Sequence, residues 1–323
     1  MTWEFTGKFN VGLDITLFDR VFITADYYNH QTKDMVFEVP ISRTTGFATA
    51  DYNIDQLQNQ GFEMSLTTNI IKGERLDWSV TLNGSHNQNK LVRLDSEKPI
   101  EGAITIQEVG RDIFTFKMRE WAGVDPETGA GLWYKNETGD ETTNNYNEAT
   151  KRYLGTASPK FEGSFSSNLS FMGIDFSFLL TTSLGRKIYG DNLMYDECTM
   201  DAYAPHTQWV YDNRWQKPGD KAKVPAMALG SYQAGLESAS SRYLMNGNYL
   251  KIKSISLGYN LPKSVLEPLH MQSLRIFAQA ENLYTFHHKD YRGFDPSSVG
   301  ANGVQWWNYP QARSFTLGLT IGF

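Results

Sequence analysis

The C-terminal segment of the chain constrains its fold most, because apolar and small polar residues alternate along it without a break. Between residue 315 and the end of the chain every intervening residue is Thr or Gly, and the apolar residues are Phe315, Leu317, Leu319, Ile321 and Phe323. A period of two predicts a β-strand with one apolar face. The other face is polar but uncharged, so the pattern leaves open whether the apolar side meets a protein core or lipid.

The same alternation recurs in eight further segments of the chain. They are residues 9–17, 21–28, 62–70, 76–83, 161–171, 174–181, 250–261 and 274–281. Together with the terminal segment they predict an all-β chain of about nine strands, each of about ten residues, which is the length of a tilted strand in a membrane barrel. The alternation changes phase between Ile252 and Ile255, and this predicts a β-bulge.

The connections between these strands alternate between short and long. The short ones are residues 18–20, 72–74, 172–173 and 262–272, and the long ones are about 38–56, 91–157, 187–242 and 287–311. Alternate connections of an up-and-down sheet lie at the same end, so one end carries tight turns and the other carries the large loops. This arrangement is typical of outer-membrane barrels. The pattern therefore predicts an antiparallel, up-and-down transmembrane β-barrel fragment with short periplasmic turns and long extracellular loops.

The polar faces of the predicted strands consist mainly of Ser, Thr, Asn, Asp and Glu, and Arg275 is a rare cation among them. Such faces suit a water-filled lumen, which Glu162 and Asp175 are expected to line. The alternative fold is a soluble β-sandwich or barrel. Its outward faces would carry more charge, and its apolar faces would meet in a dry, two-layered interior.

Composition excludes several classes of function. The chain has 323 residues and a formal net charge of −6, without the basic stripe of a nucleic-acid surface. It has no apolar run long enough for a transmembrane helix, and Cys198 alone cannot form an intrachain disulfide framework. The first ten residues do not read as a signal peptide. The six His residues lack metal-ligand spacing and no catalytic constellation is evident, so we expect no enzyme, metal site or cofactor.

Several longer motifs resemble those of one known family. Near the C-terminus these are "GNYLKIKSISLGYNLP" (247–262), "LRIFAQAENLYTF" (274–286), "GFDP" (293–296) and the terminal "FTLGLTIGF". Upstream they are "NQGFEMSL" (59–66), "WAGVDPETGAGLWY" (121–134) and "YLGTASPKFEGSFSSNLSF" (153–171). Together these motifs span nearly the whole chain. The sequence thus resembles the last barrel strands of SusC-like (RagA-like) TonB-dependent outer-membrane transporters.

The resemblance implies a barrel of about 22 strands around an N-terminal plug. Residues 1–323 would then be the C-terminal portion of that barrel, without the plug, the TonB box or the signal peptide. It also implies TonB-dependent nutrient uptake across the outer membrane, with oligosaccharides or glycans as the expected substrates and peptides as the other ligand class. The implied partners are a SusD-like surface lipoprotein, TonB acting through the plug, the lipid bilayer and the barrel-assembly machinery. The assembly signal would be Phe323 with the apolar face of its strand.

Large aromatic residues gather in the long connections and are the candidate ligand-binding residues. They are Trp306, Trp307 and Tyr309 in the last connection, Trp209 and Trp215 in the one before it, and Trp133 in the first large one. Aromatic rings stack on the C–H faces of sugars, while neighbouring Asn, Asp and Arg bond the hydroxyl groups. Packing between loops, or docking of a partner, is the alternative role for such rings.

Two other functions stay open from the sequence. One is a complete small barrel that acts as a passive porin or adhesin. The other is a soluble, β-rich carbohydrate-binding module. A reading frame for a plug directly upstream would contradict the first, and a requirement for detergent would contradict the second.

Overall fold

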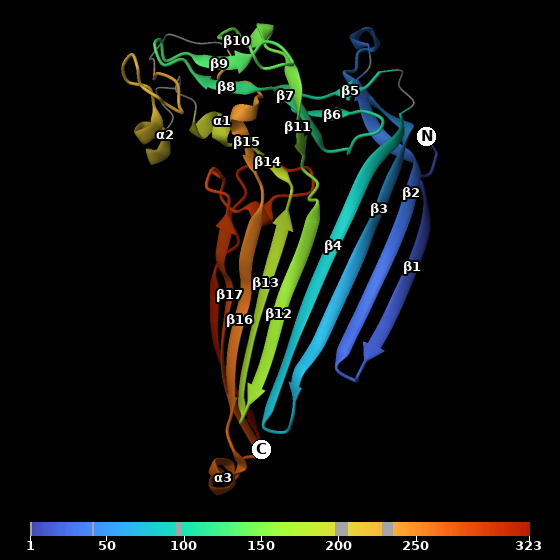
Figure 1. Ribbon diagram of the computed structural model, residues 1–323, viewed down its shortest axis with the longest axis vertical. Helices are drawn as coiled ribbons and strands as arrows, with labels where there is room; N and C mark the ends of the chain where they lie inside the picture. The colour runs from blue at the N-terminus through green and yellow to red at the C-terminus, as the bar shows by residue number, and fades with distance from the viewer. Residues whose placement is uncertain (1, 41, 95–97, 198–205, 228–234) are drawn as a thin grey trace.

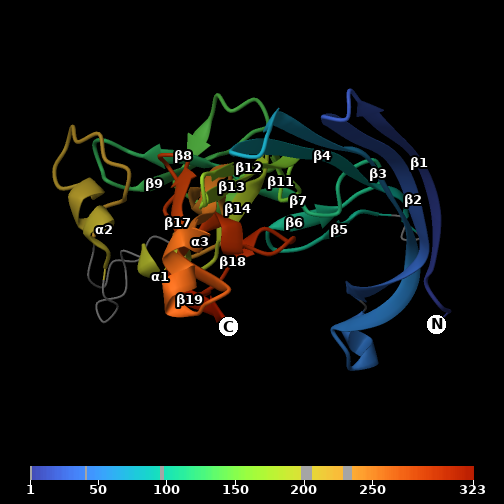
Figure 2. The same cartoon turned by 90° about the horizontal axis from the view of Figure 1, so that it is seen from below.

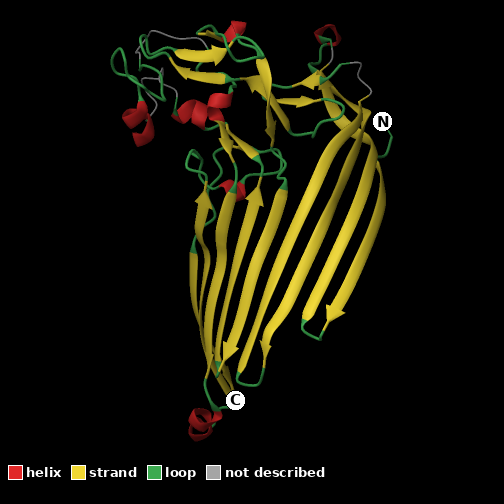
Figure 3. Ribbon diagram, in the orientation of Figure 1, coloured by secondary structure: helices red, strands yellow, loops and turns green. Residues whose placement is uncertain are grey.

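A single nine-stranded antiparallel sheet forms most of the molecule (Figures 1 and 3). The computed structural model describes residues 2–40, 42–94, 98–197, 206–227 and 235–323. The strands of the sheet are β1 (Phe5–Leu17), β2 (Val21–Pro40), β3 (Thr49–Lys72), β4 (Leu76–Leu94), β12 (Phe161–Phe171), β13 (Ile174–Leu184), β16 (Tyr249–Asn260), β17 (Ser273–His287) and β19 (Ser314–Gly322). They neighbour one another in that order. The predicted nine-stranded, up-and-down architecture is confirmed.

The sheet is an open arc rather than a closed barrel (Figure 2). Strand β1 pairs only with β2, and β19 pairs only with β17, among the strands that the structure describes. Each edge strand therefore presents a row of backbone groups without a neighbouring strand. Such edges are not tolerated in lipid, and this arc needs further strands to close.

The two faces of the sheet differ as the alternation predicts. Val11 and Leu317 on the apolar face are 56% and 80% exposed, and Val80 and Phe165 on the same face are half-buried. No second layer of described residues covers this face, so the two-layered sandwich that was the alternative fold is excluded. The opposite face is concave, polar and hollowed.

Short turns join the strands at one end of the sheet (Figure 1). Phe18 and Asp19 between β1 and β2, and Met172 and Gly173 between β12 and β13, all have positive φ. Two successive residues with positive φ form the turn that matches the twist of the paired strands. The connection between β16 and β17 is longer and includes α3 (Lys263–Leu266) and the 3₁₀ helix η4 (Glu267–Leu269). The predicted tight end is thereby confirmed.

Strands β2, β3 and β4 are about twice as long as predicted, with 20, 24 and 19 residues. The predicted long loop at 38–56 is wrong, because β2 runs to Pro40, β3 begins at Thr49 and only η1 (Arg43–Thr45) lies between them. The register shifts around Asp34, whose φ is 57°, and the Asn53 side chain donates a hydrogen bond to its carbonyl at 2.6 Å. The pairing of β2 with β3 continues beyond this irregularity, as far as Pro40 opposite Thr49.

Polar side chains support these long strands beyond their apolar part. On one face a ladder of amides crosses from β2 to β4, with hydrogen bonds of 2.9–3.1 Å: Gln56 to Gln31, Gln58 to Asn29, and Gln60 to Gln88. Cross-strand pairs of this kind are the unit that stabilises a sheet. Sequence reasoning ended the strands too early because Gln and Asn do not alternate with apolar residues here.

The long connections fold into three small sheets at the other end of the wall (Figure 1). The first consists of β5 (Ile100–Glu101), β6 (Thr105–Gln107), β7 (Thr115–Arg119) and β11 (Lys151–Thr156). The second consists of β8 (Trp121–Val124), β9 (Gly131–Tyr134) and β10 (Thr142–Thr143), and the third of β14 (Lys187–Gly190), β15 (Leu244–Asn246) and β18 (Val304–Gln305). The short helices α1 (Leu193–Asp196), α2 (Gln208–Asn213), η2 (Tyr146–Glu148), η3 (Ser241–Tyr243) and η5 (Pro296–Ser298) complete this loop region.

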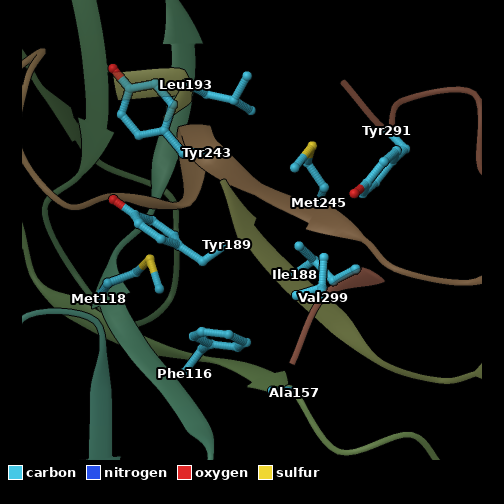
Figure 4. Close-up of a cluster of buried hydrophobic side chains, with 10 residues drawn as sticks. All are labelled: Phe116, Met118, Ala157, Ile188, Tyr189, Leu193, Tyr243, Met245, Tyr291 and Val299. Carbon is cyan, nitrogen blue, oxygen red and sulfur yellow. The ribbon is translucent and has the colours of Figure 1, made fainter. Parts of the chain in front are cut away.

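The loop region has a hydrophobic core of its own. Figure 4 shows ten buried side chains that converge from separate connections: Phe116, Met118, Ala157, Ile188, Tyr189, Leu193, Tyr243, Met245, Tyr291 and Val299. Burial raises the pKa of the Tyr189 and Tyr291 hydroxyl groups. Residues of three connections meet here, those between β4 and β12, between β13 and β16 and between β17 and β19. The long connections therefore fold together as one unit.

The bulge predicted in β16 is confirmed. Leu179 pairs with Ser254 and Leu180 with Ile252, so Lys253 is the extra residue. The bulge reverses the alternation, and Lys251 consequently lies on the polar face. No helix in the described part of the chain has the length and apolar character needed to cross a bilayer.

Candidate functional site

The concave face carries a row of carboxylates at one height of the wall. Asp26 of β2 lies directly opposite Glu63 of β3, Glu63 lies opposite Ser85 of β4, and Ser85 lies opposite Glu162 of β12. None of the three carboxylates forms an ion pair with another described residue. They line a hollow of about 490 Å³. Like charges placed opposite one another are destabilising, so the row is not explained by the stability of the sheet.

A second hollow, of about 440 Å³, lies between the wall and the loop region. It shares Ser85, Glu162 and Tyr249 with the first hollow, so the two lie next to each other. Its wall side is lined by three amides, Asn59, Asn87 and Asn89, and its loop side by residues such as Arg186 and Ser297. The space thus combines hydrogen-bonding groups with one cation.

The amides of this upper hollow are held in place by their neighbours. Asn89 donates to Asn59 at 2.8 Å, and its own oxygen accepts the backbone N–H of Ile113 at 3.0 Å. The Tyr28 hydroxyl donates to Asn87 at 2.9 Å. Side chains fixed in this way lose little freedom when they bind a ligand, which favours binding.

Arg186 follows the end of β13 and is only 8% exposed. Its Nη2 donates to the carbonyl of Gly300 at 3.0 Å, whereas its buried Nε has no hydrogen-bond partner among the described residues. It has no ion pair among the described residues, and burial lowers the pKa of its guanidinium. A buried charge of this kind is costly unless it is paired.

A buried ion pair fastens the last connection to the wall. Lys251 of β16 is 2% exposed, and its ammonium donates to Asp295 at 3.2 Å, Ser297 at 2.7 Å and Gln311 at 3.0 Å. Burial acts to raise the pKa of Asp295, but hydrogen bonds from Ser297 and Lys251 outweigh it and lower that pKa. The three acceptors all belong to the segment between β17 and β19.

A second ion pair joins the same connection to the one before it. Arg292 Nε donates to Glu197 Oε1 at 2.6 Å, and Glu197 is almost completely buried. Arg242 donates to the Glu197 carbonyl at 3.0 Å, and the Arg292 guanidinium lies 4.7 Å from the ring centre of Trp209. The loop region is therefore tied together by charge as well as by its apolar core.

The aromatic residues of the last connection lie open to solvent. Trp306 is 53% exposed, Trp307 is 58% exposed and Tyr309 is 95% exposed. The rings of Trp307 and Tyr195 lie 6.2 Å apart at an angle of 43°. These rings have free faces, as a stacking or docking surface requires.

The other three predicted aromatic residues take part in loop packing. Trp133 is completely buried and contacts Trp121 and Tyr146 edge to face, so its ring has no face open to a ligand in this structure. Trp215 is half-buried, and its indole donates to the carbonyl of Pro126 at 2.8 Å. Trp209 is half-buried beneath Arg292. The structure does not bring these residues together with the exposed rings into one site.

The terminal strand presents its apolar residues outward along the open edge. Exposed fractions are 74%, 80%, 58%, 40% and 79% for Phe315, Leu317, Leu319, Ile321 and Phe323. On the other face of the same strand, Gly318 lies beneath the ring of Phe277, with no room for a Cβ atom. The strand therefore keeps one apolar face free and packs the other closely.

The predicted lumenal residues lie on the concave face. Glu162 lines both hollows, and Asp175 pairs with Arg275 across Gly258 at 2.5 Å. Sequence reasoning missed Arg186 and Lys251. The available signal was weak: Arg186 directly follows a predicted strand, and Lys251 turns inward only because of the predicted bulge.

The open arc, its apolar convex face and its hollowed polar face define a section of the wall of a large up-and-down barrel. No protein-family model matches the chain. A solved structure of the RagAB peptide transporter has this fold, with a TM-score of 0.86 at 24% identity over 100% of this chain and 36% of that chain. The RagAB peptide importer in its open-open state gives a TM-score of 0.84.

Curated relatives match the chain along its whole length. TonB-dependent receptor P3 of Formosa agariphila is 28% identical over 355 residues, which cover 100% of this chain and 34% of that protein. TonB-dependent receptor SusC of Bacteroides thetaiotaomicron is 26% identical and is covered to 32%. The chain spans about a third of the length of the curated relatives it matches.

The chain is thus related throughout its length to the SusC-like TonB-dependent receptors, and the resemblance predicted from its motifs is confirmed. The relatives and the solved structures are named as receptors, transporters or importers, and none is named as an enzyme.

Proposed function

We propose that this chain is the C-terminal part of the barrel of an outer-membrane, TonB-dependent nutrient transporter. The observation that carries the proposal is the wall itself, with apolar residues on its convex face and a polar, hollowed concave face. Hydrocarbon outside and water inside account for both faces at once. The two unpaired edges fit a section of a longer barrel that also holds a plug.

The proposed substrates are oligosaccharides, with peptides as the other class. SusC-like relatives favour the first, and the RagAB structures, named as a peptide transporter and importer, favour the second. The exposed rings of Trp306, Trp307 and Tyr309 would stack on sugar faces at the outer mouth. Trp209, Trp215 and the buried Trp133 would support the loops that carry these rings.

The proposed partners follow from the same relationship. A SusD-like surface lipoprotein would cover the loop end, and TonB would act through the plug. The apolar face that ends at Phe323 would be recognised by the barrel-assembly machinery before the strand meets lipid. The unpaired edge of β19 is consistent with recognition by the assembly machinery, because its backbone groups still need a partner strand.

Uptake measurements test the proposed function. A strain with the complete gene and an otherwise identical strain without it would be supplied with fluorescently labelled oligosaccharides and peptides. We expect accumulation only in the first strain, and we expect it to stop when tonB is deleted. Uptake that continues without TonB would instead support the passive porin.

A matched pair of variants tests the aromatic residues. Trp307→Ala removes an exposed ring of the last connection, and Tyr284→Ala removes a ring that is 50% exposed at the upper end of β17. We expect only the Trp307 change to weaken sugar binding, by about 1 kcal/mol for the loss of one stacked ring. Equal effects of the two variants, or loss of lipoprotein capture without any loss of sugar binding, would contradict a ligand-stacking role.

A further inference from the structure

The upper hollow contains a cation whose hydrogen-bonding capacity is not used. A guanidinium has five N–H donors arranged as a planar fork. In Arg186 one Nη donates to Gly300, while the buried Nε has no acceptor. The residue is more than nine-tenths buried and lines the hollow of about 440 Å³. A positive charge therefore lines the hollow, and the described residues leave part of its hydrogen-bonding capacity unused.

A purely structural role does not explain this arrangement. Desolvation of a buried charged group costs several kcal/mol. One hydrogen bond to a backbone carbonyl does not offset that cost. The two other buried cations of the described residues have other surroundings. Lys251 is paired with Asp295. Arg242 donates to the Glu197 carbonyl and lies against the rings of Trp121 and Tyr243, and it does not line this hollow. Glu162 lines the same hollow but does not approach Arg186 within ion-pair distance. An acceptor outside the described residues would satisfy Arg186, and an anionic acceptor would also offset the cost of burying its charge.

The rest of the hollow indicates what kind of molecule carries that anion. Asn59 and Asn87 offer amide groups, Tyr249 offers a ring and a hydroxyl, and Glu162 offers a carboxylate that accepts hydrogen bonds. A ligand that satisfies these groups carries hydroxyl or N–H donors beside its anionic group. A planar carboxylate matches the fork of Arg186 better than a point anion does.

We propose that the upper hollow is a binding subsite for a carboxylate-bearing ligand, with the Arg186 guanidinium donating to that carboxylate. Two sources have this chemistry: an acidic oligosaccharide containing uronic acid, and the C-terminus of a short peptide. The inference rests on the proposed transport function and specifies the charge of the substrate. The neutral asparagines would hold the body of the ligand in either case.

Binding to the full-length receptor in detergent tests the proposal. The probes are trigalacturonate with neutral galactotriose, and trialanine with its C-terminal amide, measured by calorimetry. The variants are Arg186→Gln, which removes the charge, and Arg186→Lys, which keeps the charge without the fork. Arg275→Gln is the matched control, because Arg275 is a lumenal cation that already has a partner in Asp175.

We expect the wild-type receptor to prefer the charged member of one probe pair. Arg186→Gln should weaken that ligand about tenfold or more and leave its neutral counterpart unchanged. The affinity of Arg186→Lys for the charged ligand should lie between those of wild type and Arg186→Gln. Arg275→Gln should bind both ligands like wild type. The pair that shows the preference identifies the source of the carboxylate.

Two results would overturn the inference. One is equal binding of charged and neutral probes by the wild-type receptor. The other is an equal loss for both members of a pair in Arg186→Gln and in Arg186→Lys, which would mean that the residue only supports the loop. TonB-dependent uptake of a neutral nutrient would persist in either case, so the transport function would stand although this inference failed.

Discussion

Replacing Lys251 should release the last connection from the wall, because a single ammonium holds three of its side chains. Lys251→Met keeps the length of the side chain and removes its charge. Asp295 would then be a buried carboxylate without its cation. Breaking a buried pair in this way costs about 3–5 kcal/mol. We expect the lower value, since Ser297 still donates to Asp295 through its backbone N–H at 2.9 Å and its hydroxyl at 2.8 Å.

Hydrogen exchange in the full-length receptor would measure this loss where it acts. The backbone N–H of Tyr189 donates to Gly303 at 2.8 Å and that of Asp191 to Gln305 at 2.9 Å, so both amides report detachment of the connection. A local loss of about 3 kcal/mol accelerates their exchange on the order of a hundredfold. Lys251→Met/Asp295→Asn should recover part of the protection because it leaves no buried charge.

The effect should also depend on pH. The pKa of Asp295 is lowered in the folded protein from an ordinary value of 3.8. The stabilisation is therefore present above that ordinary value and is lost as the pH falls through the folded pKa. Wild type and Lys251→Met should differ at neutral pH and converge only when the pH falls below the folded pKa of Asp295, which itself lies below 3.8. Unchanged exchange of Tyr189 and Asp191 in the variant at neutral pH would refute the reasoning.

Three further changes test the wall. Gly318→Val places a side chain where the Phe277 ring lies, at 2.1 Å from its Cβ position, and should destabilise the barrel by about 1–3 kcal/mol in urea unfolding. Leu319→Arg on the convex face should cost about 2–4 kcal/mol in the same assay. Thr316→Arg on the concave face should cost little, because Thr316 lies opposite the neutral Gln279; a larger loss for Thr316→Arg than for Leu319→Arg would mean that lipid does not lie on the convex side. Deleting Phe323 should reduce the amount of folded receptor in isolated outer membranes, and normal assembly would show that the terminal ring is not the signal.

The sequence was sufficient for the nine-stranded order because strand pairing here depends on a local property. Each strand alternates by itself, and short turns join each pair, so neighbours in the chain are neighbours in the sheet. The bulge near Lys253 was visible for the same reason, since a change of phase is a local signal. The length of β2 to β4 was not visible, because their upper parts are held by cross-strand amides such as Gln60 and Gln88.

The candidate site was harder to predict because its residues meet only in three dimensions. Asn59, Arg186 and Ser297 lie far apart in the chain, and no spacing connects them. Aromatic content pointed to the loops but did not distinguish Trp307, which is open to solvent, from Trp133, which is enclosed. Burial of an individual ring in a folded loop depends on contacts between distant segments, and composition does not record these contacts.

The height of the wall at β2 to β4 has a mechanical consequence. The 24 residues of β3 extend roughly 80 Å along the strand at about 3.3 Å per residue. At a tilt of about 35–45° this is a height of roughly 55–65 Å, whereas the apolar band of such a barrel is about 25 Å tall. In the proposed barrel the surplus would stand above the bilayer as a hydrogen-bonded extension of the sheet. Because neighbouring strands are hydrogen-bonded there, this side of the mouth should resist bending more than the side formed by the shorter strands β12 to β19.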